Sequence, residues 1–122
     1  RRQRQMCIRD RYSGYAGGLT INPNYYQVIS GKTGHAEAIE IIYDNDIVSF
    51  ETLLKVFFDS HDPTTPNRQG PDYGSQYRSI AFYTNDDEKE KIKNYINFLS
   101  TNSIFGKKII TELKEIDKFY YA

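Results

Sequence analysis

The sequence predicts a single α+β domain, a loop-rich two-layer α/β sandwich in which helices pack on a mixed or antiparallel sheet. Three observations lead to this prediction. The 122 residues suffice for one hydrophobic core but not for two. Stretches that alternate between apolar and polar residues follow one another with stretches of helical periodicity, in the order strand, helix, strand, helix, strand. Glycine, proline and asparagine clusters separate these stretches, as expected for turns.

The first half of the domain should contain a loop platform, a strand and a helix. Glycines and the Asn-Pro and Ser-Gly pairs make residues 14–34 a series of turns. Residues 36–43 alternate and then become continuously apolar, which predicts a strand that ends at the turn formers 44–46. Ser49 is a suitable N-cap for a helix. The apolar residues of that helix follow a spacing of three and four, and they are Phe50, Leu53, Leu54, Phe57 and Phe58.

The second half repeats the pattern. Residues 77–84 alternate and predict a second strand. Asn85 and Glu88 have the spacing of a capping box, and a second amphipathic helix should follow. Its apolar face consists of Ile92, Tyr95, Ile96 and Leu99. Residues 108–113 predict a third strand, and an aromatic patch follows at 119–121.

Residues 1–13 do not fit this pattern. They carry five arginines in the first eleven positions and show no usable periodicity. The sequence therefore predicts a disordered or non-native tail, arising from an artificial fusion or a faulty gene prediction, ahead of one domain at 14–122. A basic arm for nucleic acid is the alternative, but aromatic residues are not interleaved with the arginines.

Composition narrows the class of protein. Sixteen basic residues balance sixteen acidic ones, so no overall field attracts nucleic acid or an anionic membrane. No apolar run is long enough to span a bilayer, and the N-terminal arginines precede no secretory apolar region, so we expect a cytoplasmic protein. A single cysteine, Cys7, excludes an internal disulfide framework and a multi-cysteine zinc site. The eleven tyrosines suit a cavity that is both apolar and polar.

The segment 61–79 is the best candidate for a functional loop. It combines turn formers, amides, acids, an arginine and two tyrosines, and it has almost no aliphatic residues. Such a segment cannot form core, and constrained loops on a rigid scaffold are where sites concentrate.

Glu37 is the strongest single candidate for chemistry. On the alternating strand it shares a face with Ile39 and Ile41, which directs a carboxyl group toward apolar neighbours. Burial there would raise the pKa of Glu37 and make it a general acid near neutral pH. The alternative is a glutamate at a strand end that pairs with Arg78 or accepts hydrogen bonds from loop amides.

Two motif matches do not hold. Gly31-Lys32-Thr33 resembles the end of a phosphate-binding loop, but Tyr26 stands where the first glycine is needed, and a strand follows instead of a helix. The His35-Ala36-Glu37 spacing occurs in zinc deaminases, yet the required Pro-Cys-x-x-Cys is absent. We expect no metal, and we expect His35 and His61 to hold turns through backbone hydrogen bonds.

Four motifs together resemble the A class of the peptide methionine sulfoxide reductase family. They are GYAGG at 14–18, NPNYYQV at 22–28, SGKTGHAE at 30–37 and the segment 61–79, in the family's order, and the resemblance spans about 14–121. It implies an enzyme of protein repair under oxidative stress, which reduces methionine S-sulfoxide in oxidised proteins or as the free amino acid. It further implies no bound cofactor, thioredoxin or another dithiol as reductant, and a monomer when complete.

The resemblance also implies roles for individual residues. In this family a cysteine thiolate attacks the sulfoxide sulfur, and a glutamate, here Glu37, protonates the departing oxygen. Two tyrosine hydroxyls hold that oxygen, and by motif these are Tyr25 and Tyr77. Asp72 would steady the pocket through hydrogen bonds, and the pocket would be supported by Gly34, His35, Gln76 and Arg78.

The chain departs from the family at both ends. The family's Gly-Cys-Phe-Trp nucleophile motif is absent, the chain has no tryptophan, and Cys7 lies too near Gly14 to take that place, so it is expected to be an incidental thiol. The family also continues beyond the residue matching Ala122. We therefore expect a truncated domain that carries the substrate pocket without the nucleophile, and whose sheet exposes apolar surface where a strand and a helix are missing. The alternatives are a non-catalytic binding or interaction module, and an unrelated α+β hydrolase that uses Glu37 and Asp72 as a carboxylate pair.

Overall fold

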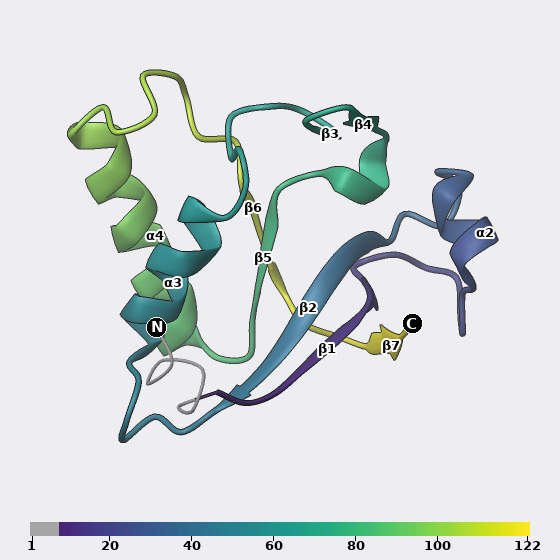
Figure 1. The fold of residues 1–122 in the computed structure, drawn as a ribbon, viewed down its shortest axis with the longest axis horizontal. Coiled ribbons are helices and arrows are strands. Elements are labelled where there is room, and N and C mark those ends of the chain that lie inside the picture. Colours follow the sequence, from purple (N-terminus) through teal and green to yellow (C-terminus); the bar gives the residue numbers. More distant parts are fainter. Residues whose placement is uncertain (1–7) are drawn as a thin grey trace.

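A three-stranded antiparallel sheet forms one part of the molecule in the computed structural model, which describes residues 8–122 (Figure 1). Its strands are β1 (Ile8–Ala16), β2 (Ala36–Tyr43) and β7 (Phe119–Tyr121), in the order β2-β1-β7. The bounds of β2 agree with the strand predicted at 36–43. Strands and helices alternate along the chain as predicted, and the α+β class is confirmed.

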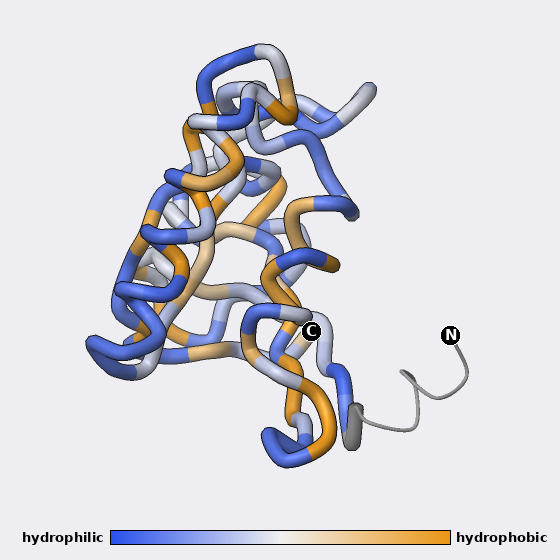
Figure 2. The backbone as a smooth tube through the Cα atoms, turned by 90° about the vertical axis from the view of Figure 1, so that its left-hand side faces the viewer, coloured by the Kyte–Doolittle hydropathy of each residue, from blue (hydrophilic) through white to orange (hydrophobic). Residues whose placement is uncertain are grey.

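The second part packs two helices on a small parallel sheet. Helices α3 (Phe50–Asp59) and α4 (Asp86–Thr101) contact each other and lie beside the pair β5 (Ile80–Tyr83) and β6 (Glu112–Glu115). The apolar stretches of the helices turn inward, and their outer sides are hydrophilic (Figure 2). The core contains six buried side chains, Leu54, Phe58, Ala81, Ile92, Leu99 and Ile109.

Short elements connect these parts. Helix α2 (Tyr25–Ile29) interrupts the first loop region, and the hairpin β3 (Arg68–Gln69) and β4 (Asp72–Tyr73) lies in the long loop. A 3₁₀ turn, η1 (Ser75–Tyr77), leads from this loop into β5. The predicted strand at 77–84 is therefore shorter, because its first residues are used for the turn.

Side-chain caps fix the start of each longer helix. The Ser49 hydroxyl accepts the Thr52 amide of α3 at 3.1 Å, and the Asn85 side chain accepts the Glu88 amide of α4 at 2.9 Å. The Glu88 carboxylate does not close the predicted capping box on Asn85. Instead, this carboxylate accepts a hydrogen bond from the Thr84 amide, at 2.7 Å, one residue before the N-cap Asn85.

Two predictions need correction. Residues 8–13, expected in a disordered or foreign tail, form most of β1 and pair with β2 from Ile8 opposite Tyr43 onward. A strand that forms through pairing with a distant segment need not show periodicity in its own sequence, so the local pattern gave no sign of β1. Residues 1–7, including Cys7, lie outside the described part. The strand predicted at 108–113 begins only at Glu112, because the Ile110 amide bonds to the Pro63 carbonyl of the long loop, at 2.9 Å, and not to a neighbouring strand.

Strand β2 is an edge strand with an unusually apolar open face. Ile39 is 64% exposed and Ile41 is 37% exposed. An edge strand with exposed apolar side chains is a surface on which another segment or chain can pair. Within residues 8–122 no helix has the length and hydropathy needed to cross a bilayer.

Candidate functional site

Glu37 is positioned by two loops that pack backbone against backbone. A Cβ atom on Gly18 would lie 2.3 Å from the His35 nitrogen, so only glycine allows this approach. The Leu19 amide donates to the Thr33 carbonyl at 3.0 Å and closes the same contact. These contacts fix the end of β1 against the start of β2, where Glu37 is the second residue.

His35 holds these loops together. Its Nδ1 accepts the Gly18 amide at 3.0 Å, which leaves Nε2 to donate to the Thr20 carbonyl at 2.7 Å. The side chain is only 2% exposed. Both ring nitrogens are occupied by the backbone, so His35 fixes a turn as expected and is not available to a metal ion.

The side chains of Arg78 and Gln76 bond to backbone carbonyls of neighbouring segments. Arg78 donates to the Ser75 carbonyl at 2.8 Å and to the Gly34 carbonyl at 2.9 Å. Its Nε lies 3.2 Å from a Glu112 carboxylate oxygen. The buried Gln76 side chain donates to the Ile29 carbonyl, at 3.4 Å. Arg78 therefore pairs with Glu112, and the alternative in which it neutralises Glu37 is wrong.

The predicted acid and hydroxyl groups interact electrostatically. Partial burial raises the pKa of Glu37, and the neighbouring Asp72 carboxylate raises it further. Burial also raises the pKa of Tyr77, followed by the effects of Glu37, Asp72 and Tyr25. Side chains from β2, β4, η1 and α2 therefore lie near one another, since Asp72 acts on Glu37, and Glu37, Asp72 and Tyr25 all act on Tyr77.

Tyr15 is a member of this cluster that sequence reasoning missed. Burial raises its pKa, with further contributions from Glu37 and Tyr25. It stands directly opposite Glu37 in the β1–β2 register. The only signal was the tyrosine of GYAGG, because the register that places it beside Glu37 depends on a strand that the local pattern does not show.

Asp72 acts differently from the expectation. The side chain is exposed on β4, and within residues 8–122 it makes none of the predicted hydrogen bonds. Its effect on Glu37 is that of a nearby like charge. The hydrogen-bonding role predicted for Asp72 is therefore not observed in the described part.

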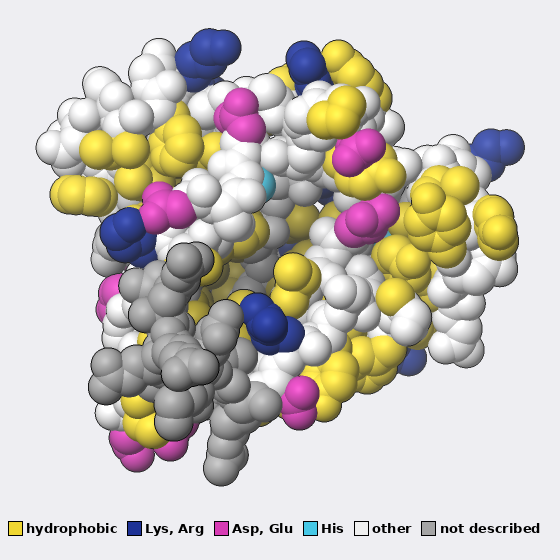
Figure 3. Space-filling view, viewed as in Figure 1, with side chains coloured by type: hydrophobic (Ala, Val, Ile, Leu, Met, Phe, Trp, Pro, Cys, Tyr) yellow, Lys and Arg dark blue, Asp and Glu magenta, His cyan; other side chains and the backbone are white. Residues whose placement is uncertain are grey.

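The side chains of Glu37, Asp72 and Tyr25 are exposed, and that of Tyr77 is partly exposed. Two hollows of the described surface are lined by other residues, one of about 430 Å³ that includes His61 and one of about 380 Å³ at residues 22–23 and 119–121. Acidic side chains border a hydrophobic surface on the α2 side of the molecule (Figure 3). Tyr25, the first residue of α2, is 53% exposed.

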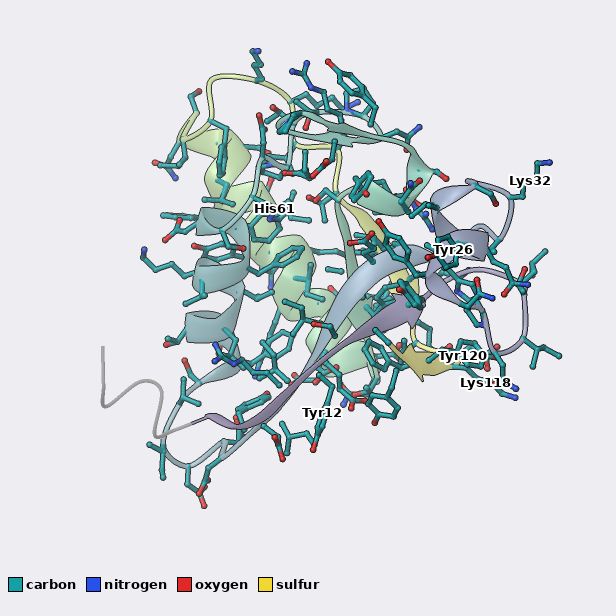
Figure 4. The ribbon with its side chains drawn as sticks, turned by 45° about the vertical axis from the view of Figure 1, so that its right-hand side comes forward. Tyr12, Tyr26, Lys32, His61, Lys118 and Tyr120 are labelled. Atoms are coloured by element: carbon teal, nitrogen blue, oxygen red, sulfur yellow. The ribbon has the colours of Figure 1, made fainter. Side chains whose placement is uncertain are left out.

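His61 is far from this cluster. It lies beside α3, on the opposite side of the molecule from Tyr26 and Tyr120 (Figure 4). Its Nδ1 donates to the Phe57 carbonyl and its Nε2 contacts the Ser79 hydroxyl, both at 2.7 Å. Among residues 8–122 no three metal-binding side chains come together.

The arrangement suits an oxygen that accepts strong hydrogen bonds. A carboxyl group with a raised pKa can keep its proton near neutral pH and deliver it. Phenol hydroxyls remain neutral there and can donate to the same oxygen.

Known proteins that are similar to this chain indicate its family. The family model described as "Peptide methionine sulfoxide reductase" matches residues 2–122. A "Peptide methionine sulfoxide reductase MsrA" of Natronomonas pharaonis is 50% identical over 110 residues, which are 90% of this chain and 62% of that protein. The chain thus spans less than two thirds of the length of this relative.

Solved structures share the fold. The crystal structure of Mxr1 from Saccharomyces cerevisiae in reduced form matches with a TM-score of 0.89 and 33% identity, over 97% of this chain and 67% of Mxr1. Mxr1 in complex with Trx2 matches with a TM-score of 0.69 and 24% identity, over 97% of this chain and 65% of that one. The match over nearly the whole chain places it in the peptide methionine sulfoxide reductase family.

Proposed function

We propose that this chain carries the substrate pocket of a peptide-methionine (S)-S-oxide reductase, which acts on methionine S-sulfoxide in oxidised proteins or as the free amino acid. The observation that supports this is that Asp72 acts on Glu37, and that Glu37, Asp72 and Tyr25 act on Tyr77, although the four residues come from separate elements. By motif, Glu37 resembles the family's acid, and Tyr25 and Tyr77 resemble its oxygen-binding tyrosines. Membership of the family argues against an unrelated hydrolase built on Glu37 and Asp72.

The chemistry assigns each group one task. Tyr25 and Tyr77 donate hydrogen bonds to the sulfoxide oxygen, and Glu37 gives it a proton. Protonation draws electrons from sulfur and makes it electrophilic toward a thiolate. Over the whole reaction the sulfoxide and two thiols give methionine, a disulfide and water, so sulfur of the substrate is reduced while the thiols are oxidised.

We propose that the attacking thiolate is not Cys7. Cys7 is the single cysteine of the chain, and it lies outside the described residues. The relative from Natronomonas is longer than the region matched here, and the nucleophile of the full-length enzyme would belong to such an additional part. Thioredoxin or another dithiol would restore that cysteine in the cytoplasm, where dithiols are kept reduced, without a bound cofactor.

The acid role of Glu37 is tested in an extended chain. This protein joins residues 8–122 to the parts of the Natronomonas relative that the chain does not span. Glu37→Gln should slow sulfoxide reduction by about a hundredfold or more at neutral pH, because the proton donor is lost. Tyr121→Phe, on the other face of the sheet, is the matched control. An unchanged rate in Glu37→Gln would remove Glu37 from the mechanism.

A non-catalytic module that binds sulfoxide is the second candidate, and the single cysteine favours it. It predicts that the native protein binds methionine S-sulfoxide but leaves it unreduced with excess dithiol. Turnover by the native protein, without any part taken from a relative, would exclude this candidate.

A further inference from the structure

Tyr15 faces the site across the β1–β2 pair. It stands opposite Glu37, one pair before the strands separate at Ala16 and Ala36. Directly opposed residues of antiparallel strands project from the same face, with Cβ atoms roughly 5 Å apart. The side chains of Tyr15 and Glu37 are therefore neighbours on one face of the sheet.

The ring of Tyr15 is held firmly. The residue is only 7% exposed, and the adjacent Ala16 is fully buried. On its other side β1 pairs with β7, where Tyr15 lies opposite Tyr120. A ring enclosed in this way keeps its hydroxyl in one position.

The hydroxyl of Tyr15 has no protein partner among residues 8–122. The hydroxyls of Tyr12 and Tyr121 differ in this respect, since each donates to a carboxylate at 2.8 Å. In the described part, the Gln76 Oε1 atom alone is a fully enclosed side-chain polar atom without a hydrogen bond. The unpartnered Tyr15 hydroxyl is thus not sealed in the core, and it reaches the surface.

The direction in which that hydroxyl opens follows from its electrostatic neighbours. Glu37 and Tyr25 both act on Tyr15. Both also act on Tyr77. Tyr15 and Tyr77 therefore approach the same pair of residues from different elements, β1 and η1.

We propose that Tyr15 provides a third hydroxyl to the oxygen-binding group, beside Tyr25 and Tyr77. Its buried ring presents an unpartnered donor next to Glu37, where the oxygen of a bound sulfoxide would lie. This assignment rests on the function proposed above. The ligand group it recognises is a sulfoxide oxygen, and a thioether without that oxygen gains nothing from it.

The experiment measures binding to the 122-residue chain by NMR titration. The probes are methionine S-sulfoxide, methionine R-sulfoxide and methionine. Tyr15→Phe keeps the ring and removes only the hydroxyl, and it should weaken S-sulfoxide binding roughly three- to tenfold, as expected for one hydrogen bond. Its affinity for methionine should not change. Tyr121→Phe, which loses a hydroxyl on the opposite face, should bind all three probes like the wild type.

A second measurement tests the proposal even if the Tyr15→Phe variant fails to fold. Tyr15 is replaced by 3-fluorotyrosine, which keeps ring and hydroxyl, and its fluorine signal should move on addition of S-sulfoxide but not of methionine. An unmoved signal, or equal losses of affinity for sulfoxide and methionine in Tyr15→Phe, would make Tyr15 a core residue only.

The two proposals fail in different ways. If Tyr15→Phe binds like the wild type while Glu37→Gln and Tyr77→Phe lose sulfoxide affinity, the role of Tyr15 is refuted and the proposed function stands. If the wild-type chain binds sulfoxide no better than methionine, both proposals are refuted.

Discussion

Glu37 is one of sixteen acidic residues, and its environment raises its pKa. The alternation of residues 36–43 predicts a raised pKa from a shared face with Ile39 and Ile41. The structure confirms the face, although Ile39 is mostly exposed. Partial burial is the largest cause of the raised pKa of Glu37, and the Asp72 charge is the second. No local pattern could have indicated the second cause, because Asp72 belongs to a hairpin that is distant in the sequence.

Removing the Asp72 charge should lower the pKa of Glu37. A nearby carboxylate disfavours ionisation of its neighbour, so Asp72→Asn leaves burial as the main cause of the shift. Carboxyl-carbon NMR of labelled glutamate in the 122-residue chain measures this directly. In the extended chain, activity should then fall at lower pH than in the wild type, because Glu37 loses its proton earlier.

Asp46→Asn is the control for this change. Asp46 lies in the turn after β2, and it is not among the groups that shift Glu37. A Glu37 pKa that stays the same in Asp72→Asn would show that the two carboxylates do not interact.

At the scale of elements, periodicity and capping residues in the sequence predict only some of the helices and strands. Strand β2 and helices α3 and α4 carry their own periodicity and caps, and they agree with the prediction. Strand β1 exists through its pairing with β2, and β7 exists through its pairing with the end of β1. The motifs predict a candidate site at Glu37, Tyr25 and Tyr77 but give no sign of Tyr15, because only the register of β1 places Tyr15 opposite Glu37.

The C-terminal end of α3 is joined to β5 through His61. The Nδ1 of His61 donates to the Phe57 carbonyl, and its Nε2 contacts the Ser79 hydroxyl. The Ser79 hydroxyl also lies 2.7 Å from the Thr111 hydroxyl. Burial lowers the pKa of His61 below its ordinary value of 6.5. The folded chain thus favours the neutral ring, with Nε2 as acceptor.

This linkage predicts loss of stability in mild acid. Below pH 6.5 the unfolded chain takes up a proton on His61 while the folded chain does not, so the free energy of unfolding falls with pH until the lowered folded pKa is passed. Urea unfolding across this range should show the decline in the wild type and a smaller one in His61→Gln. Equal pH dependence in both proteins would mean that His61 titrates alike in the folded and unfolded states.

On the scale of the whole molecule, the site joins the two parts of the fold. Glu37 belongs to the antiparallel sheet, and Tyr77 leads into β5 of the parallel pair. Arg78 connects them, because it bonds to Gly34 on one side and pairs with Glu112 on the other. The pocket therefore depends on the docking of both parts.

The purified 122-residue chain should not reduce methionine sulfoxide with dithiothreitol. A pocket can bind and protonate the oxygen, but reduction needs a thiolate at the sulfur. Chromatography of free methionine provides the measurement, and the extended chain provides the positive control. Turnover that disappears in Cys7→Ser would show that Cys7 reaches the site.

The pairing of β1 with β7 has a consequence for protein synthesis. Gly14, Tyr15 and Ala16 lie opposite Tyr121, Tyr120 and Phe119, and the Phe119 ring closes over Gly14. A growing chain on the ribosome has already released Glu37, Asp72 and Tyr77 when these last aromatic residues are still being added. The pairing of β7 with Tyr15 can form only after residues 119–121 have emerged from the ribosome. The nascent chain would therefore contain all its candidate site residues for some time before β7 can fix the position of Tyr15.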